Sequence, residues 1–263
     1  MKTAVTIAGS DCSGGAGIQA DLKTFAAHRI FGMSVITSVV AENTCRVIDI
    51  QDMTPSMIQN QMTAIFEDIP PDAVKVGMLS SSDCMIAVAE KLREFRPDHV
   101  VIDPVMVAKG GCSLMQQQSL QTLIQEILPL AEVLTPNLPE AEAIAGMEIH
   151  TIEDMKKAAR QIYSMGPRCV LLKGGHLSED LDAKDILFDG TDFYSYTTKR
   201  IATKNTHGTG CTFSSAITSN LALGKSIPEA VSDAKHYITM AISHALELGK
   251  GHGPTHHFYE FYE

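Results

Sequence analysis

Hydrophobic residues are spaced in two ways along this chain, and the two spacings alternate. Short apolar runs, typical of buried strands, recur from the start, as in TAVTIAG at 3–9. The next segment repeats its apolar residues at helical spacing, so that Ile18, Leu22 and Phe25 share one face. Strands that alternate with helices predict an α/β fold, in which a mostly parallel central sheet has helices on both faces.

The same periodicity predicts the other elements. Further strands are expected at 33–41, 72–78, 99–105, 132–136 and 169–175, and helices at 56–69, 81–95, 118–131, 138–146, 151–166, 208–223 and 228–246. Thr151 and Asp154 form a capping box at the start of one helix. Asp189 and Gly190 predict a hairpin turn between antiparallel strands within 185–203. No repeat or linker interrupts the pattern, which predicts a single domain, 1–263.

The composition excludes several classes of protein. With 44% hydrophobic and 20% charged residues among 263, the chain resembles an ordinary globular protein. Its 31 acidic residues outnumber its 21 basic residues, which argues against a nucleic-acid or anionic-membrane partner. No apolar run approaches the roughly 18 residues of a transmembrane helix. The 6 cysteines contain no C-x-x-C pair, so no zinc or redox motif is expected, and free thiols favour a cytoplasmic location.

Polar residues stand at several predicted strand ends, where ligands bind in sheets of this type. Asp103 and Glu140 each follow an apolar run, and Mg²⁺ commonly takes one or two carboxylates from a protein. Lys173 ends a third run before two glycines, where its charge can meet a phosphate. Each residue taken singly is more typical of a solvated surface position. Their recurrence at separate strand ends indicates a phosphate site.

The segment NTHGTGCTF, at 205–213, places two glycines and a cysteine where a long helix begins. The first N–H groups of a helix have no partner within it, so such a start can hold an anion. Cys211 is expected to have a lowered pKa there and to accept a proton from a substrate hydroxyl. The alternative is that packing requires a small side chain. Neither GSDCSGGAG at 9–17 nor GKS at 224–226 has the spacing of a dinucleotide or P-loop motif.

Six ordered segments resemble the hydroxymethylpyrimidine/phosphomethylpyrimidine kinases of thiamine biosynthesis, a branch of the ribokinase-like kinases. They are TIAGSDCSGGAGIQADLKTF, DAVKVGML, VIDPVMVAKGG, LTPNLPEAEAI, LLKGGH and NTHGTGCTFSSAI. The resemblance covers nearly the whole chain and implies a three-layer sandwich, a homodimer, and the use of Mg²⁺ and ATP. It implies phosphorylation of 4-amino-5-hydroxymethyl-2-methylpyrimidine and then of its monophosphate. The branch includes relatives that phosphorylate pyridoxine or pyridoxal, and this alternative stays open.

The resemblance also implies a role for each matching residue. Cys211 is the proton acceptor, in the place where many ribokinase-like enzymes have aspartate. The phosphate groups are expected to meet Lys109, Lys173, Thr206, Gly208, Thr209 and Gly210. The metal is assigned to Asp103 and Glu140, and the pyrimidine to Gly9, Asp21, Glu42 and Met78. Asp21 lies beside an apolar helical stripe and is expected at the edge of the buried region.

Glu42 departs from the pattern of the family, which usually reads AQNT where this chain reads AENT. An amide both donates and accepts hydrogen bonds, whereas an ionised carboxylate only accepts. An ionised Glu42 would therefore face the lone pair of a ring nitrogen poorly. We expect altered substrate affinity or pH dependence, unless Glu42 is an exposed loop acid without a role.

Other features leave alternatives. Cys112 lies in the expected mobile flap, where a thiol either traps an aldehyde such as pyridoxal or faces solvent. The histidines of GHGPTHH, at 251–257, are interpreted as a packed or solvated tail and not as metal ligands. A non-catalytic pyrimidine-binding protein is disfavoured because the phosphate-site residues are all present. A sugar or nucleoside kinase would be expected to have aspartate in place of Cys211.

Overall fold

Eight strands form the central sheet among residues 1–107, 111, 114–175 and 182–262, which the computed structural model describes. These strands are β1 (Thr3–Ala8), β2 (Phe31–Ile36), β5 (Ala73–Val76), β6 (Val100–Ile102), β7 (Val133–Leu134), β8 (Cys169–Lys173), β9 (Asp182–Phe188) and β10 (Phe193–Lys199). Their order is β10-β9-β8-β7-β6-β5-β1-β2. Neighbours from β2 to β8 in this order pair in parallel, and β9 and β10 add an antiparallel edge.

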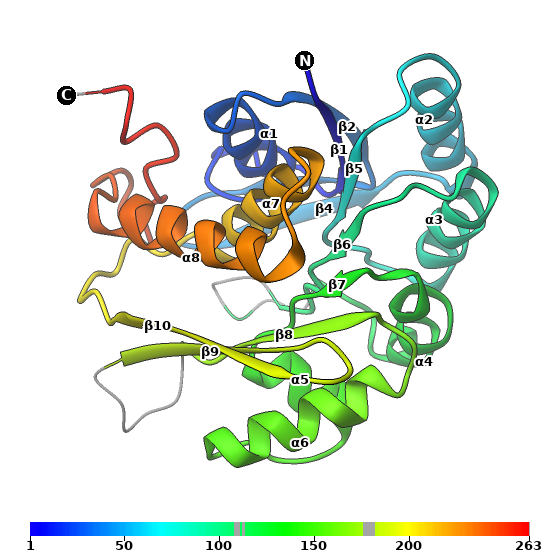
Figure 1. Ribbon diagram of the computed structural model, residues 1–263. Helices are drawn as coiled ribbons and strands as arrows, with labels where there is room; N and C mark the ends of the chain where they lie inside the picture. Colours follow the sequence, from blue (N-terminus) through cyan, green and yellow to red (C-terminus); the bar gives the residue numbers. More distant parts are fainter. Residues whose placement is uncertain (108–110, 112–113, 176–181, 263) are drawn as a thin grey trace.

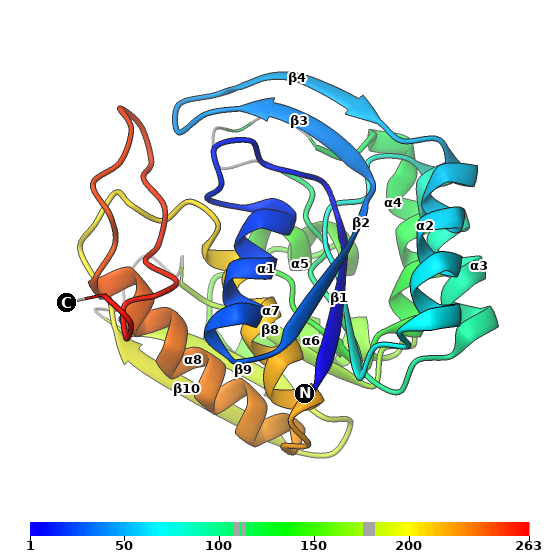
Figure 2. The same ribbon diagram turned by 90° about the horizontal axis from the view of Figure 1, so that it is seen from above.

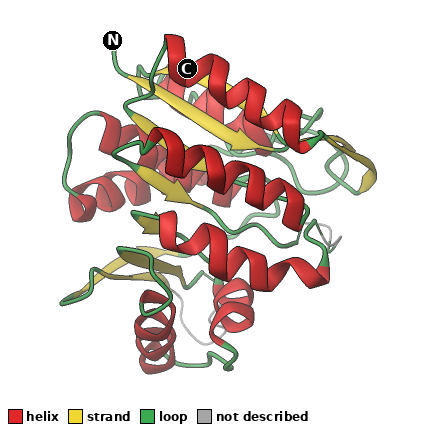
Figure 3. Cartoon of the chain, turned by 90° about the vertical axis from the view of Figure 1, so that its right-hand side faces the viewer, coloured by secondary structure: helices red, strands yellow, loops and turns green. Residues whose placement is uncertain are grey.

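Helices cover both faces of this sheet and make a three-layer sandwich (Figures 1 and 2). One layer holds α1 (Gly17–Ala27), α7 (Thr209–Ala222) and α8 (Ile227–Ser243). The other holds α2 (Pro55–Asp68), α3 (Ser82–Phe95), α4 (Leu120–Thr122), α5 (Leu138–Ala145) and α6 (Ile152–Tyr163). The helices run roughly alongside the strands when the molecule is seen from its side (Figure 3). The predicted α/β class and layer arrangement are confirmed.

The alternation of side chains along the strands separates two hydrophobic cores. On β1, Val5 and Ile7 join the core beneath α2, α3, α5 and α6, while Ala4 points to the α1 and α7 side. Small residues on that side let α7 approach the sheet closely, and every residue from Thr212 to Ala222 is buried. No helix in the described part of the chain is both long enough and apolar enough to cross a bilayer.

Three local predictions were incomplete or wrong. The expected strand at 33–41 is two strands that part at Thr37, because β3 (Ser38–Glu42) leaves the main sheet. It pairs with β4 (Val47–Asp52), which the sequence analysis missed, in a small antiparallel sheet. The expected helix at 118–131 is irregular and contains a π-helical segment, Leu123–Ile127, before a 3₁₀ turn with Pro129. Proline has no N–H to continue a regular helix.

Two other local predictions are confirmed. Thr151 and Asp154 form the capping box of α6. Asp189 turns the chain between β9 and β10 through hydrogen bonds from the backbones of Thr191 and Asp192. The carboxyl ends of the parallel strands meet at one edge of the sheet, and the amino end of α7 lies at the same edge. Polar residues at these ends are thereby brought together.

Candidate active site

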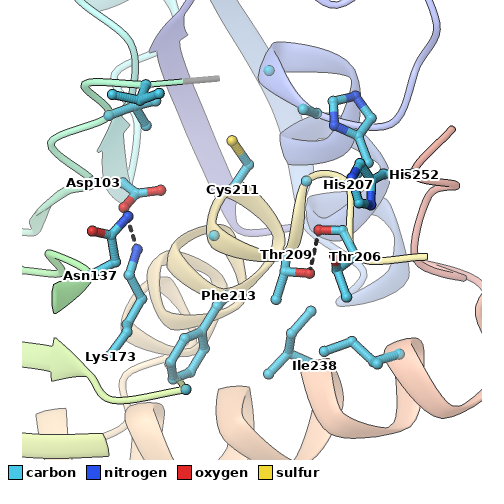
Figure 4. Close-up of a pocket in the computed structure, with 18 of the residues that line it drawn as sticks. Asp103, Asn137, Lys173, Thr206, His207, Thr209, Cys211, Phe213, Ile238 and His252 are labelled. Atoms are coloured by element: carbon cyan, nitrogen blue, oxygen red, sulfur yellow. Dashed lines mark hydrogen bonds and ion pairs between the residues drawn. The ribbon is translucent and has the colours of Figure 1, made fainter. Parts of the chain in front are cut away.

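A cavity of about 740 Å³ opens at the carboxyl edge of the sheet, around the amino end of α7. Figure 4 shows Asp103, Asn137 and Lys173 on one side of this end, and Thr206 and His207 on the other. The lining also includes Ala8, Gly9, Glu42 and Met78 from the ends of β1, β3 and β5, and Phe213, Ile238 and Ile242 from α7 and α8. The predicted strand-end residues therefore surround a single cavity.

The amino end of α7 is shaped to hold an anion. Gly208 caps it at a φ of 75°, and no described side chain makes a capping hydrogen bond. A Cβ at this position would overlap the carbonyl oxygen of Gly15, so only glycine allows the two loops to meet. The hydroxyl of Thr209 donates to the carbonyl of Thr206 at 2.8 Å, which fixes the turn. The N–H of Thr209 also donates to the carbonyl of Thr206, whereas those of Gly210 and Cys211 have no backbone acceptor among the described residues and are left for a ligand.

Asp103 and Lys173 form an ion pair beside this helix end. The Lys173 Nζ lies 2.7 Å from Asp103 Oδ1, and the Thr135 hydroxyl donates to the same oxygen at 3.2 Å. A Cβ built on Gly210 would lie 3.3 Å from Asp103 Oδ2, so the second carboxylate oxygen faces the first turn of α7. Burial opposes the charge of Lys173, but Asp103 and Glu140 raise its pKa. The ammonium is therefore charged at neutral pH.

Glu140 combines a structural and an electrostatic role. Its carboxylate accepts the N–H of Asn137 at 2.8 Å, and its own N–H donates to Asn137 Oδ1, which caps α5. Its pKa is raised to about 7, first by burial, with a contribution from the charge of Asp103 that Lys173 opposes. Two neighbouring buried carboxylates supply oxygen ligands and negative charge, which suits Mg²⁺. The residues present therefore fit the expected metal.

Cys211 lines the cavity in the first turn of α7, but its predicted ionisation is wrong. The pKa of the thiol is raised to about 11, mainly by burial, although the charge of Lys75 acts in the opposite direction. The partial charge at a helix start is therefore too small to offset desolvation here. The cysteine is therefore a neutral thiol at physiological pH.

Asp21 is placed differently from the prediction. It is fully buried and is not among the cavity-lining residues. Its carboxylate accepts from Lys75 Nζ at 2.8 Å, Thr6 Oγ1 at 2.6 Å and Ser215 Oγ at 2.7 Å. These donors use both carboxylate oxygens. Asp21 therefore links α1, β1, β5 and α7 and does not face the cavity in which a substrate would bind. Lys75 lines the cavity instead, and a single lysine inside an apolar strand was the missed signal.

His207, which the sequence analysis also missed, lines the other side of the cavity and is paired with Asp11 behind it. The His207 Nε2 lies 2.8 Å from Asp11 Oδ2, and Asp11 also receives both donors of Ser13 and the N–H groups of Gly15 and Ala16. Burial opposes ionisation of Asp11, yet these hydrogen bonds lower its pKa. The pair ties the β1–α1 loop to the loop before α7.

Glu42 stands next to this pair, at a bulge near the end of β3. Its pKa is raised to about 7, first by burial and then by the negative charge of Asp11, while His207 acts oppositely. Ligand atoms of Asp11, Glu42 and His207 lie within 4.8 Å of one another, a spacing that a metal could use. Asp11 already accepts hydrogen bonds on both oxygens, so the cluster fits a hydrogen-bonded network better than a metal centre.

Comparison with known proteins places this geometry in a family. A model described as phosphomethylpyrimidine kinase matches residues 11–256. The hydroxymethylpyrimidine/phosphomethylpyrimidine kinase of Bacillus subtilis is 48% identical, over 97% of this chain and 94% of that protein. The chain belongs to the phosphomethylpyrimidine kinase family.

Two other relatives show how wide this family is. The thiamine biosynthesis bifunctional protein ThiED of Geobacter sulfurreducens is 51% identical over 96% of this chain, which spans only 51% of that longer protein. A pyridoxal kinase of Bacillus subtilis, solved as an ADP complex, is 41% identical with a TM-score of 0.91. That alignment covers 98% of this chain and 97% of that one. Relatives with this fold therefore carry names for different substrates.

Three of the other predicted site residues also face the cavity. Gly9, Met78 and Thr206 line the cavity, and a Cβ on Gly9 would lie 2.8 Å from the end of the Met78 side chain. Lys109 and Cys112 lie outside the described residues. In the tail, His257 is buried, and its Nε2 lies 3.0 Å from the hydroxyl of Thr212.

Replacing Glu42 by glutamine should change the pH dependence of stability. The unfolded chain loses the Glu42 proton near its ordinary pKa of 4.5, whereas the folded protein keeps it to about 7. The stability that this group contributes is therefore lost as pH rises across that window. Because Glu42 is only partly buried, we expect Glu42→Gln to gain about 1 kcal/mol over the native protein between about pH 5 and about pH 8.

Urea unfolding of both proteins at the two pH values measures this difference. Glu67→Gln, at an exposed position on α2, is the matched control and should leave the difference unchanged. An equal effect of Glu42→Gln at both pH values would contradict the inferred burial of the acid.

Proposed function

We propose that this family member transfers the γ-phosphoryl group of ATP to 4-amino-5-hydroxymethyl-2-methylpyrimidine, and then to the resulting monophosphate. The observation that carries the proposal is the amino end of α7, where free N–H groups, Cys211, and the Asp103–Lys173 pair face one cavity. A phosphoryl group placed there would meet positive charge on two sides. Phosphoryl transfer depends mainly on such positioning and electrostatic stabilisation.

The two ends of the cavity suit the two substrates. Phe213, Ile238 and Ile242 provide an apolar surface on the α7 and α8 side, which fits the base of a nucleotide. The ADP complex of the related pyridoxal kinase supports a nucleotide in this family. The Gly9 and Met78 side would take the pyrimidine. Below a pH of about 7, Glu42 is mostly a neutral acid and can both donate and accept, as the usual glutamine does.

The reaction itself requires little from the side chains beyond placement. In the first transfer the substrate hydroxyl oxygen bonds to the γ-phosphorus while the bond to the bridging oxygen breaks and ADP leaves, and the hydroxyl proton passes to an oxygen of the phosphoryl group. In the second transfer a phosphate oxygen of the monophosphate takes the place of the hydroxyl oxygen. Bound Mg²⁺ would supply charge neutralisation of the phosphate oxygens, and Asp103 and Glu140 would hold it. Lys173 and the first-turn N–H groups of α7 stabilise the transferring group. Cys211, a neutral thiol in the free protein, orients the hydroxyl through a hydrogen bond to its sulfur.

A mass-resolved time course with Mg²⁺ and ATP tests the substrate. One reaction contains the hydroxymethylpyrimidine and a parallel one contains pyridoxal, because the related pyridoxal kinase keeps the second candidate open. We expect monophosphate followed by diphosphate in the first reaction. Pyridoxal phosphate alone would contradict the pyrimidine assignment and leave the phosphoryl-transfer site intact. No product in either reaction would contradict the proposed kinase function.

Replacing Cys211 by alanine should lower kcat by about 10²-fold or more, with ATP affinity changed far less, because the thiol acts on the hydroxyl. Cys45→Ala, which removes an exposed thiol, is the control.

A pH profile of kcat distinguishes a thiol that orients the hydroxyl from a thiolate that acts as a general base. A required thiolate with a pKa of about 11 would make the rate rise steeply toward that pH, whereas an orienting thiol adds no such rise.

Family membership also supports a homodimer in the cytoplasm as part of this proposal. Light scattering should then give about twice the chain mass of 28.5 kDa. A mass near that of one chain across the concentrations used for activity would contradict the dimer without affecting the chemistry.

A further inference from the structure

A buried ion pair that the proposed mechanism does not use lies in the cavity wall. Asp185 of β9 and Lys235 of α8 meet at 2.7 Å between Oδ2 and Nζ, with side chains only 4% and 11% exposed. Both residues line the cavity. Removing two charges from water is costly, and their attraction often fails to offset that cost. Stability alone is therefore a weak explanation for a charged pair at this point.

The other carboxylate oxygen of Asp185 reaches the backbone that follows Lys173. Asp185 Oδ1 accepts the N–H of Gly174 at 3.0 Å, and Asp185 is paired with Lys173 in the β8–β9 register. A Cβ on Gly174 would overlap the carbonyl oxygen of Lys184, so the chain passes very close to β9 here. The position of the Gly174 peptide is thereby fixed by both contacts.

This fixed peptide connects directly to the phosphate site. Lys173 extends from it to Asp103, which its Nζ meets at 2.7 Å beside the start of α7 (Figure 4). In the other direction, Lys235 lies on α8, one turn before Ile238, which lines the nucleotide side of the cavity. The ion pair thus joins the helix that would contact the nucleotide to the lysine that would contact its phosphates.

We propose that Asp185 and Lys235 are positioning residues that hold Lys173 in register with the phosphoryl group. Lys235 fixes the carboxylate, the carboxylate fixes the N–H of Gly174, and this peptide sets the point from which the Lys173 side chain extends. The proposal rests on the proposed kinase function. It predicts that the hydrogen bond to Gly174, and not the charge of the pair, is what turnover requires.

Two double variants separate these contributions. Asp185→Asn/Lys235→Met and Asp185→Leu/Lys235→Met both remove the two charges, but only the first keeps an oxygen that can accept from Gly174. We expect the leucine variant to have a kcat about 10- to 100-fold below that of the asparagine variant, with pyrimidine affinity within about twofold. Asp233→Asn, in an exposed pair on the same helix, is the control and should not alter turnover.

Urea unfolding first checks that the two double variants have similar free energies of unfolding, so that their kcat values can be compared. Pyrimidine affinity is measured in the absence of nucleotide. Equal kcat in the two double variants would overturn the proposal, as would a parallel loss of pyrimidine affinity in the leucine variant. If the leucine variant does not fold, Asp185→Ala/Lys235→Met takes its place with the same expected ratio. An inactive native protein would refute the kinase function, a result distinct from either variant outcome.

Discussion

The cavity depends on a buried ion pair between Asp21 of α1 and Lys75 of β5, neither of which is exposed. Removing one partner of such a pair leaves an uncompensated charge and typically costs about 3–5 kcal/mol. The same carboxylate accepts from Ser215, in the second turn of α7. The pair therefore seats α7 against the sheet, and this seating places Cys211 and the free N–H groups at the strand ends.

The charges around α7 are arranged to receive more negative charge. Lys75 and Lys173 are held as ammonium groups by neighbouring carboxylates, and the pKa of each is raised despite burial. The pKa of Glu140 is raised to about 7 mainly because the side chain is buried, and the charge of Asp103 contributes less. A cation held beside Asp103 and Glu140 would offset both effects and favour the ionised carboxylates.

The surroundings of Glu42 show how a carboxylic acid can stand where the family usually has an amide. Asp11 and His207 are 196 residues apart in sequence and form one hydrogen-bonded unit. Partial burial, and then the charge of Asp11, raise the pKa of Glu42 to about 7. A protonated acid offers a donor and an acceptor, so the glutamate can replace an amide without losing either function. The protonation state of Glu42 therefore depends on Asp11 and His207, which are not its neighbours in the sequence.

Local patterns in the sequence determined most of the strands and helices, because their periodicity and caps depend on nearby residues, but they missed β4 and its pairing with β3. They also indicated Asp103, Glu140 and Lys173, since residues at the ends of parallel strands must share one edge. Only the tertiary structure decided the burial of Asp21 and the protonation of Cys211. Ionisation depends on desolvation and on charges from distant segments. The sequence therefore locates the site, whereas packing determines which of its groups are charged.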